Sequence, residues 1–120
     1  MLPVSYDVAI WAGPRPSSNE SATKEFERRA AVFDDEGTLA PASPKLKEFV
    51  EELLTILPPL DESDDPASPW ATGPEPGTVT GEFAYLTMTY PGARAALDTV
   101  IDVARRHGLI CFDPQETALL

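Results

Sequence analysis

Cysteine and histidine are nearly absent from this chain of 120 residues, which holds one of each, Cys111 and His107. A single cysteine cannot form an intrachain disulfide, so a secreted fold held by such bonds is excluded. A catalytic site that needs histidine would have to use His107. Its position just before Gly108 instead suits the C-terminal end of a helix, where a positive charge is favourable.

Basic residues are also scarce. Lysine and arginine number 9 against 20 aspartates and glutamates, which gives a formal net charge of -11. An average surface of this sign repels phosphates, so we expect neither nucleic acid nor an anionic membrane as a partner. A basic protein partner, a cation and a neutral small molecule are the partners that this charge leaves open.

Long apolar runs are missing as well. No stretch approaches the roughly 20 apolar residues that span a bilayer. The short apolar run near the N-terminus has no basic region before it and is interrupted by Asp7, which differs from the pattern of a signal peptide. The sequence therefore predicts a soluble cytoplasmic protein.

The motifs that usually indicate a cofactor or a metal do not occur. There is no glycine-rich phosphate loop, no CxxC pair and no cluster with metal-ligand spacing. The acidic stretch 61–65 lacks the spacing and the central glycine of a calcium-binding EF-hand loop. Cys111 is expected inside a strand, where a thiol is usually inert. We expect no cofactor and no metal, and the lack of a catalytic set favours a protein that is not an enzyme.

Periodic segments lie between the 13 prolines. Apolar residues alternate from Val4 to Trp11 with the period of a strand. Ser17 with Glu20 resembles a capping box at a helix start, and Ser43 followed by Pro44 is typical of another. The predicted elements are strand 4–11, helix 17–33, helix 43–57, a short strand at 68–71, strand 83–90, helix 91–107 and strand 109–112.

This order of elements, β-α-α-β-β-α-β, predicts a single α+β domain over residues 1–120. It fits a ferredoxin-like split βαβ sandwich with an extra helix in the first crossover. In that topology a four-stranded, antiparallel-rich sheet carries helices mainly on one face. The first strand would lie parallel to strand 83–90 and antiparallel to strand 109–112.

The predicted topology gathers aromatic residues around the loop Gly13-Pro14-Arg15-Pro16. Trp11, Trp70 and Tyr90 would share one end of the sheet with Arg15. These candidate binding residues could form an aromatic pocket with one cationic group. The alternative is a hydrophobic plug that closes the core.

The same topology places three carboxylates, Asp7, Glu82 and Asp113, at the opposite end of the sheet. Such an acidic cluster could share a proton or bind a cation. The alternative is that these side chains face water and that Asp113 caps a turn before Pro114.

One face of the predicted sheet carries Trp11, Phe83 and Tyr85. Large bare apolar patches are rare on soluble proteins. We therefore expect this face to be covered, either by the extra helix or by a second subunit in a homodimer.

Three short motifs, "SYDVAIWAGPRP", "SPWATGP" and "RRHGLICFDPQ", resemble a group of small bacterial proteins that begin with Ser-Tyr-Asp and an early tryptophan. The group implies no established activity. The resemblance points to a set of positions to examine, namely Asp7, Trp11, Pro14, Trp70, Gly73, Asp113 and Pro114. In size and acidity the chain is also similar to immunity proteins of bacterial toxin systems.

Two functions are open at this point. The first is an acidic interaction module, immunity-protein-like in scale, that engages another protein through electrostatic contacts. The second is a small-molecule-binding protein or enzyme with a pocket at one end of the sheet or at a dimer interface. The sequence indicates no catalytic residue for this second function.

Overall fold

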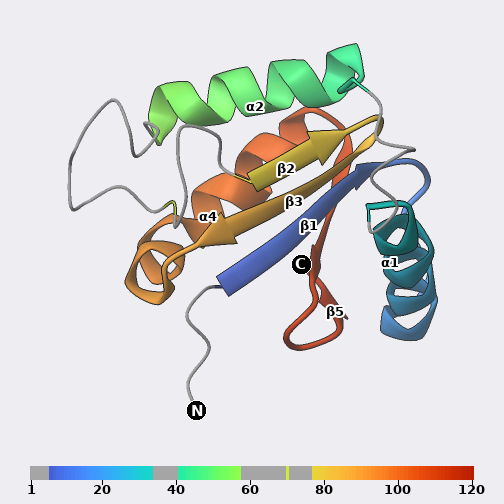
Figure 1. The fold of residues 1–120 in the computed structure, drawn as a ribbon. Coiled ribbons are helices and arrows are strands. Elements are labelled where there is room, and N and C mark those ends of the chain that lie inside the picture. The colour runs from blue at the N-terminus through green and yellow to red at the C-terminus, as the bar shows by residue number, and fades with distance from the viewer. Residues whose placement is uncertain (1–5, 34–40, 58–69, 71–76) are drawn as a thin grey trace.

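The computed structural model describes residues 6–33, 41–57, 70 and 77–120, and shows an α+β fold in which helices pack on a sheet (Figure 1). In chain order the described elements are β1 (Tyr6–Ala12), α1 (Asn19–Phe33), α2 (Pro44–Ile56), β2 (Gly77–Thr80), β3 (Phe83–Met88), α4 (Tyr90–Arg106), β4 (Leu109–Asp113) and β5 (Ala118–Leu119). Among these residues no helix is long and apolar enough to cross a membrane.

The described strands form one five-stranded antiparallel sheet in the order β2-β3-β1-β4-β5. The predicted parallel pairing of β1 with β3 is wrong, because Tyr6 pairs with Met88 and Trp11 with Phe83 in antiparallel register. The pairing of β1 with β4 is antiparallel as predicted. The ferredoxin-like classification and the four-strand count are not confirmed.

The hairpin of β2 and β3 contains β2, which is one of two strands, with β5, that the sequence did not predict. Thr80 pairs with Phe83, so only Gly81 and Glu82 form the turn. Gly81 has a φ of 54°, and a positive φ at the first turn position is what tight hairpins require. The run Thr78-Val79-Thr80 before Gly81 carries this signal, but the elements predicted from the sequence include no strand there.

The helices cover both faces of the sheet, as Figure 1 shows for α1 and α2. Side chains of α2 and α4 pack with Val8 and Ile10 of β1 in the larger core cluster. Ala22 and Phe26 of α1 pack on the opposite face with Trp11 and other residues in a smaller cluster. The expectation of helices mainly on one face therefore holds for α2 and α4, while α1 is the helix that covers the aromatic face.

Local capping explains where the helices begin. The Ser43 hydroxyl accepts a hydrogen bond from the Leu46 amide, as predicted for α2. The Thr89 hydroxyl does the same for the Gly92 amide, so α4 begins one residue before Pro91. At α1 the accepting hydroxyl is that of Ser18, which bonds the Ser21 amide at 3.1 Å, and not that of Ser17.

Two sequence predictions fall largely outside the described residues. The acidic stretch 61–65 lies outside them entirely. Of the predicted strand 68–71 only Trp70 is described, and it forms an isolated antiparallel bridge with Met88.

Candidate functional site

The structure separates the four candidate binding residues. Trp11 lies opposite Phe83, at one end of β3, and Trp70 lies opposite Met88, at the other end. The two indoles also belong to core clusters on opposite faces of the sheet. The predicted placement of both tryptophans at one end of the sheet is therefore wrong, because it depended on β1 running parallel to β3.

Trp70 and Tyr90 lie near the start of β1 instead. Trp70 is only 1% exposed, and its indole N–H donates to the Leu57 carbonyl at 2.9 Å, just past the end of α2. The Tyr90 ring meets the Tyr6 ring edge-on at a centroid distance of 5.8 Å. Trp70 thus serves as a core plug, with its polar atom satisfied by a helix end.

The acidic cluster is also divided. Asp7 and Asp113 lie near each other, linked through the Gln115 side chain. Glu82 lies at the far end of β1, where its carbonyl accepts a hydrogen bond from the Ala12 amide. Antiparallel pairing of β1 and β3 again accounts for the separation.

Asp113 is buried, with 3% of its surface exposed, and its carboxylate is fully engaged. One oxygen accepts the Tyr6 hydroxyl, and the other accepts the backbone and side-chain N–H groups of Gln115 and the amide of Glu116. Burial is the largest cause that raises the pKa of Tyr6, and the hydrogen bond to Asp113 is the second. These bonds indicate a structural role for Asp113 as a turn cap.

The Asp7 carboxylate also accepts a hydrogen bond from a tyrosine hydroxyl. The donor is the Tyr85 hydroxyl, at 2.9 Å. Burial and this bond raise the pKa of Tyr85 to about 12. Tyr85 is therefore a neutral donor at physiological pH and holds the Asp7 side chain in place.

His107 and Cys111 each have a structural role. The His107 ring nitrogen Nε2 lies 3.0 Å from a Glu52 carboxylate oxygen, which joins the end of α4 to α2. Cys111 is buried in β4, and burial raises the pKa of its thiol to about 12. A thiol with such a pKa is a poor nucleophile at neutral pH.

A hollow of about 420 Å³ does lie beside the loop Gly13-Pro14-Arg15-Pro16. We call it the arginine-lined hollow. Its size falls within the range of small-molecule sites. Its lining residues are Trp11, Gly13, Pro14, Arg15, Pro16, Ser21, Glu25, Arg28 and Arg29.

The loop turns sharply away from the end of β1. Gly13 has a φ of 143°, a conformation that other residues adopt only with strain. Pro14 and Pro16 each fix their own φ and restrict the residue before them. The loop is therefore a rigid wall of the hollow, and it presents the exposed side chain of Arg15.

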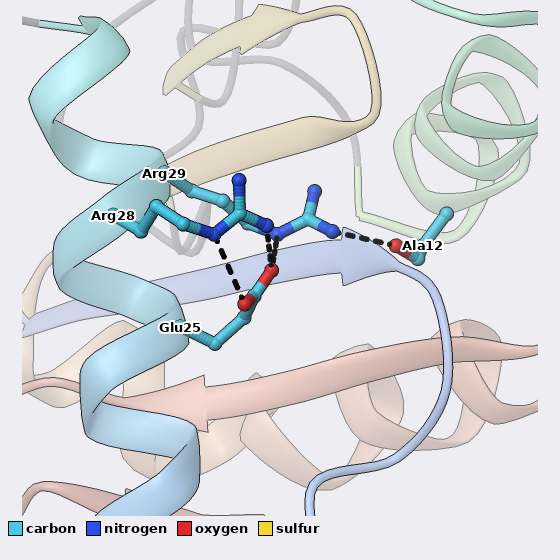
Figure 2. A network of polar contacts seen from close by, with 4 residues as sticks. All are labelled: Ala12, Glu25, Arg28 and Arg29. Carbon is cyan, nitrogen blue, oxygen red and sulfur yellow. Dashed lines mark hydrogen bonds and ion pairs between the residues drawn. The ribbon is translucent and has the colours of Figure 1, made fainter.

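Arg28 and Arg29 of α1 form another wall of the hollow. Figure 2 shows that their side chains meet Glu25 of the same helix. One Glu25 oxygen accepts from both Arg28 and Arg29, the latter at 2.7 Å, and the other oxygen accepts from Arg28 at 3.3 Å. The hydrogen bond from Arg28 is the main cause that lowers the pKa of the Glu25 carboxyl group. Glu25 is therefore ionised at neutral pH.

Arg29 connects this wall to the strand. Its Nη2 donates to the Ala12 carbonyl at 3.1 Å (Figure 2). Its guanidinium carbon lies 5.8 Å from the centre of the Trp11 ring, within the range of a cation–π contact. Trp11 itself is 1% exposed, so it forms the apolar floor beneath the arginines rather than an open surface.

The sequence predicts Trp11 and Arg15 as site residues but not Glu25, Arg28 and Arg29. A carboxylate followed by arginines three and four residues later is a common stabilising pattern on exposed helices. The pattern by itself does not indicate a site. Only the packing of α1 over the aromatic face of the sheet brings these residues to the loop.

A second, apolar hollow of about 240 Å³ lies at the other end of the sheet. Its lining residues are Tyr6, Tyr90, Ala93, Arg94 and Leu97. Among the described parts of the chain, no group of three or more His, Cys, Asp or Glu side chains could hold a metal ion.

Comparisons with protein-family models, with curated proteins and with solved structures found no match to this chain.

Proposed function

We propose that this protein is a binding module that captures a small anionic molecule in the arginine-lined hollow. The observation that carries the proposal is the set of residues that line the hollow. Three arginines and one glutamate line the hollow, although acidic residues outnumber basic ones by 20 to 9 in the whole chain. Arginine is the side chain best suited to recognise carboxylates and phosphates, because its planar N–H groups match their oxygens.

The rigid floor and wall support this function. Trp11 is buried and each loop proline fixes its own φ, so little conformational entropy would be lost on binding. Arg29 is fixed by Glu25 and by the Ala12 carbonyl. A preformed cationic surface of this kind gains affinity mainly because it does not have to reorganise.

A second function rests on the net charge of -11. An acidic surface can attract a basic protein at a rate that depends on salt. Capture of such a partner should be lost as ionic strength rises, whereas binding in the hollow depends on Arg15 and Arg28. Charge-removing variants of these two arginines therefore separate the two functions.

The test is a thermal-shift and calorimetric titration with a panel of small anions, including inorganic phosphate, sulfate, citrate and benzoate. A ligand present at about 100 times its dissociation constant should raise the unfolding free energy by roughly 2.7 kcal/mol. We expect at least one anion to bind, and Arg28→Gln to weaken it by about tenfold or more.

The control is Lys24→Gln, which removes a cation from the same helix outside the hollow. Lys24 is exposed and pairs only loosely with Glu20, at 3.7 Å. Its replacement should leave anion affinity unchanged. The proposal fails if no anion binds, or if the two variants weaken binding equally.

A further inference from the structure

The arginine-lined hollow has an excess of two positive charges. Arg15, Arg28 and Arg29 contribute three, and Glu25 removes one. A singly charged carboxylate would leave half of this excess uncompensated, whereas a phosphate monoester carries close to two negative charges at neutral pH. The charge balance therefore favours a dianion.

The two exposed arginines have room for such a group. The Arg28 side chain is 68% exposed, against 20% for Arg29. Arg15 is also exposed, and its bond to the Leu120 backbone oxygen is 3.5 Å long, at the outer limit of a hydrogen bond. Arg15 and Arg28 can therefore turn N–H groups toward a ligand, while Arg29 stays in place as part of the wall.

Glu25 already shows how this wall holds an anion. Its carboxylate bridges Arg28 and Arg29. An incoming anion would share Arg28 with this carboxylate and would be repelled by its charge. Glu25 thus opposes ligands while it positions the arginines.

The net charge of the chain and the volume of the hollow both limit the size of the ligand. With a net charge of -11, the chain repels a polyanion such as nucleic acid beyond the hollow. A hollow of about 420 Å³ suits a small molecule. The organic part of that molecule could lie against Pro14 and Pro16.

We infer that the arginine-lined hollow takes the phosphate group of a small phosphate monoester, and that Glu25 sets the affinity as a built-in competing anion. This inference rests on the proposed function and specifies its ligand class.

The test compares two ligands that share a phenyl ring, phenyl phosphate and benzoate, by calorimetry at constant ionic strength and slightly alkaline pH. We expect phenyl phosphate to bind about tenfold more tightly or better, because it is doubly charged. Inorganic phosphate alone serves as a third probe. Weaker binding of inorganic phosphate than of phenyl phosphate is expected from contact of the ring with the proline wall.

Glu25→Gln is the decisive variant, with Glu20→Gln as its matched control. Both remove one carboxylate from α1, but Glu20 does not line the hollow. We expect Glu25→Gln to raise the affinity for phenyl phosphate several-fold and Glu20→Gln to leave it unchanged. If Glu25 only held the arginines in position, its removal would lower the affinity instead, and that result would overturn the inference.

The outcomes separate this inference from the proposed function. Equal or tighter binding of benzoate overturns the phosphate assignment and leaves anion binding intact. No binding of any anion in the panel overturns both. Because the comparison of the two phenyl ligands uses the unmodified protein, the phosphate assignment stays testable even where a variant does not fold.

Discussion

At the scale of single residues, Trp11 has two roles. It packs against Phe83 and Phe112 at ring-centroid distances of 6.4 and 5.8 Å in the smaller core cluster. The Trp11 ring also lies under the Arg29 guanidinium at the arginine-lined hollow. The first role accounts for its burial, and the second places a flat apolar ring beneath the arginines.

Replacement of Trp11 by alanine should therefore cost about 3–5 kcal/mol of unfolding free energy, as large-to-small changes in cores do. Urea denaturation followed by circular dichroism measures this loss. Arg15→Ala is the matched control in the same hollow and should change stability by less than about 0.5 kcal/mol, because it is an exposed residue. A similar small loss for Trp11→Ala would contradict the role of Trp11 in the core.

At the scale of elements, a side chain just past the end of β4 replaces the backbone hydrogen bonds that a longer strand would make to β1. Ala9 pairs with Phe112 and Ile10 with Cys111, and the same register continued would place Pro114 opposite Asp7. Proline has no N–H to donate. The Gln115 side chain instead donates to the Asp7 carbonyl at 2.9 Å and accepts from the Asp7 amide at 2.7 Å.

Gln115→Ala should destabilise the protein by about 1–2 kcal/mol, since it removes two bonds to the backbone of β1 and one to Asp113. Hydrogen exchange should show the loss most strongly at the Asp7 amide. Glu116→Ala, an exposed neighbour, serves as the control and should stay within about 0.5 kcal/mol of the unmodified protein. Equal effects of both changes would mean that the amide contacts of Gln115 contribute nothing.

At the scale of the whole molecule, the charge distribution opposes folding. The net charge is -11, and the radius of gyration is only 13.6 Å, so like charges lie close together. The ion pairs that join Glu25 and Glu52 to arginines are partly exposed. Exposed pairs contribute little each, so we expect the repulsion to outweigh them.

Added salt should therefore raise the melting temperature at neutral pH. The Debye length falls from about 30 Å at 0.01 M salt to about 8 Å at 0.15 M. The first is comparable to the dimensions of the molecule, 37 × 32 × 29 Å, and the second is much shorter. Differential scanning calorimetry in sodium chloride, a salt with weak specific binding, measures the change. A melting temperature that falls with salt would show that the ion pairs outweigh the repulsion.

The sequence by itself determined most of the local structure. The Ser43-Pro44 cap predicted from the sequence lies at the observed start of α2, and the predicted helix 43–57 matches the observed bounds to within a residue. The alternation in β1 likewise indicated two faces that differ in their side chains. Such features could be predicted because capping and periodicity depend only on neighbours in the chain.

Only the tertiary structure decided the direction of strand pairing and the composition of the hollow. A strand has the same alternation in either direction, so Val4 to Trp11 could not reveal whether β3 runs parallel or antiparallel to it. The tertiary structure sets both the antiparallel register of β1 with β3 and the packing of α1 over the aromatic face. They separated Trp70 and Tyr90 from Trp11 and brought Arg28 and Arg29 to the loop, because contacts between distant segments depend on how whole elements pack.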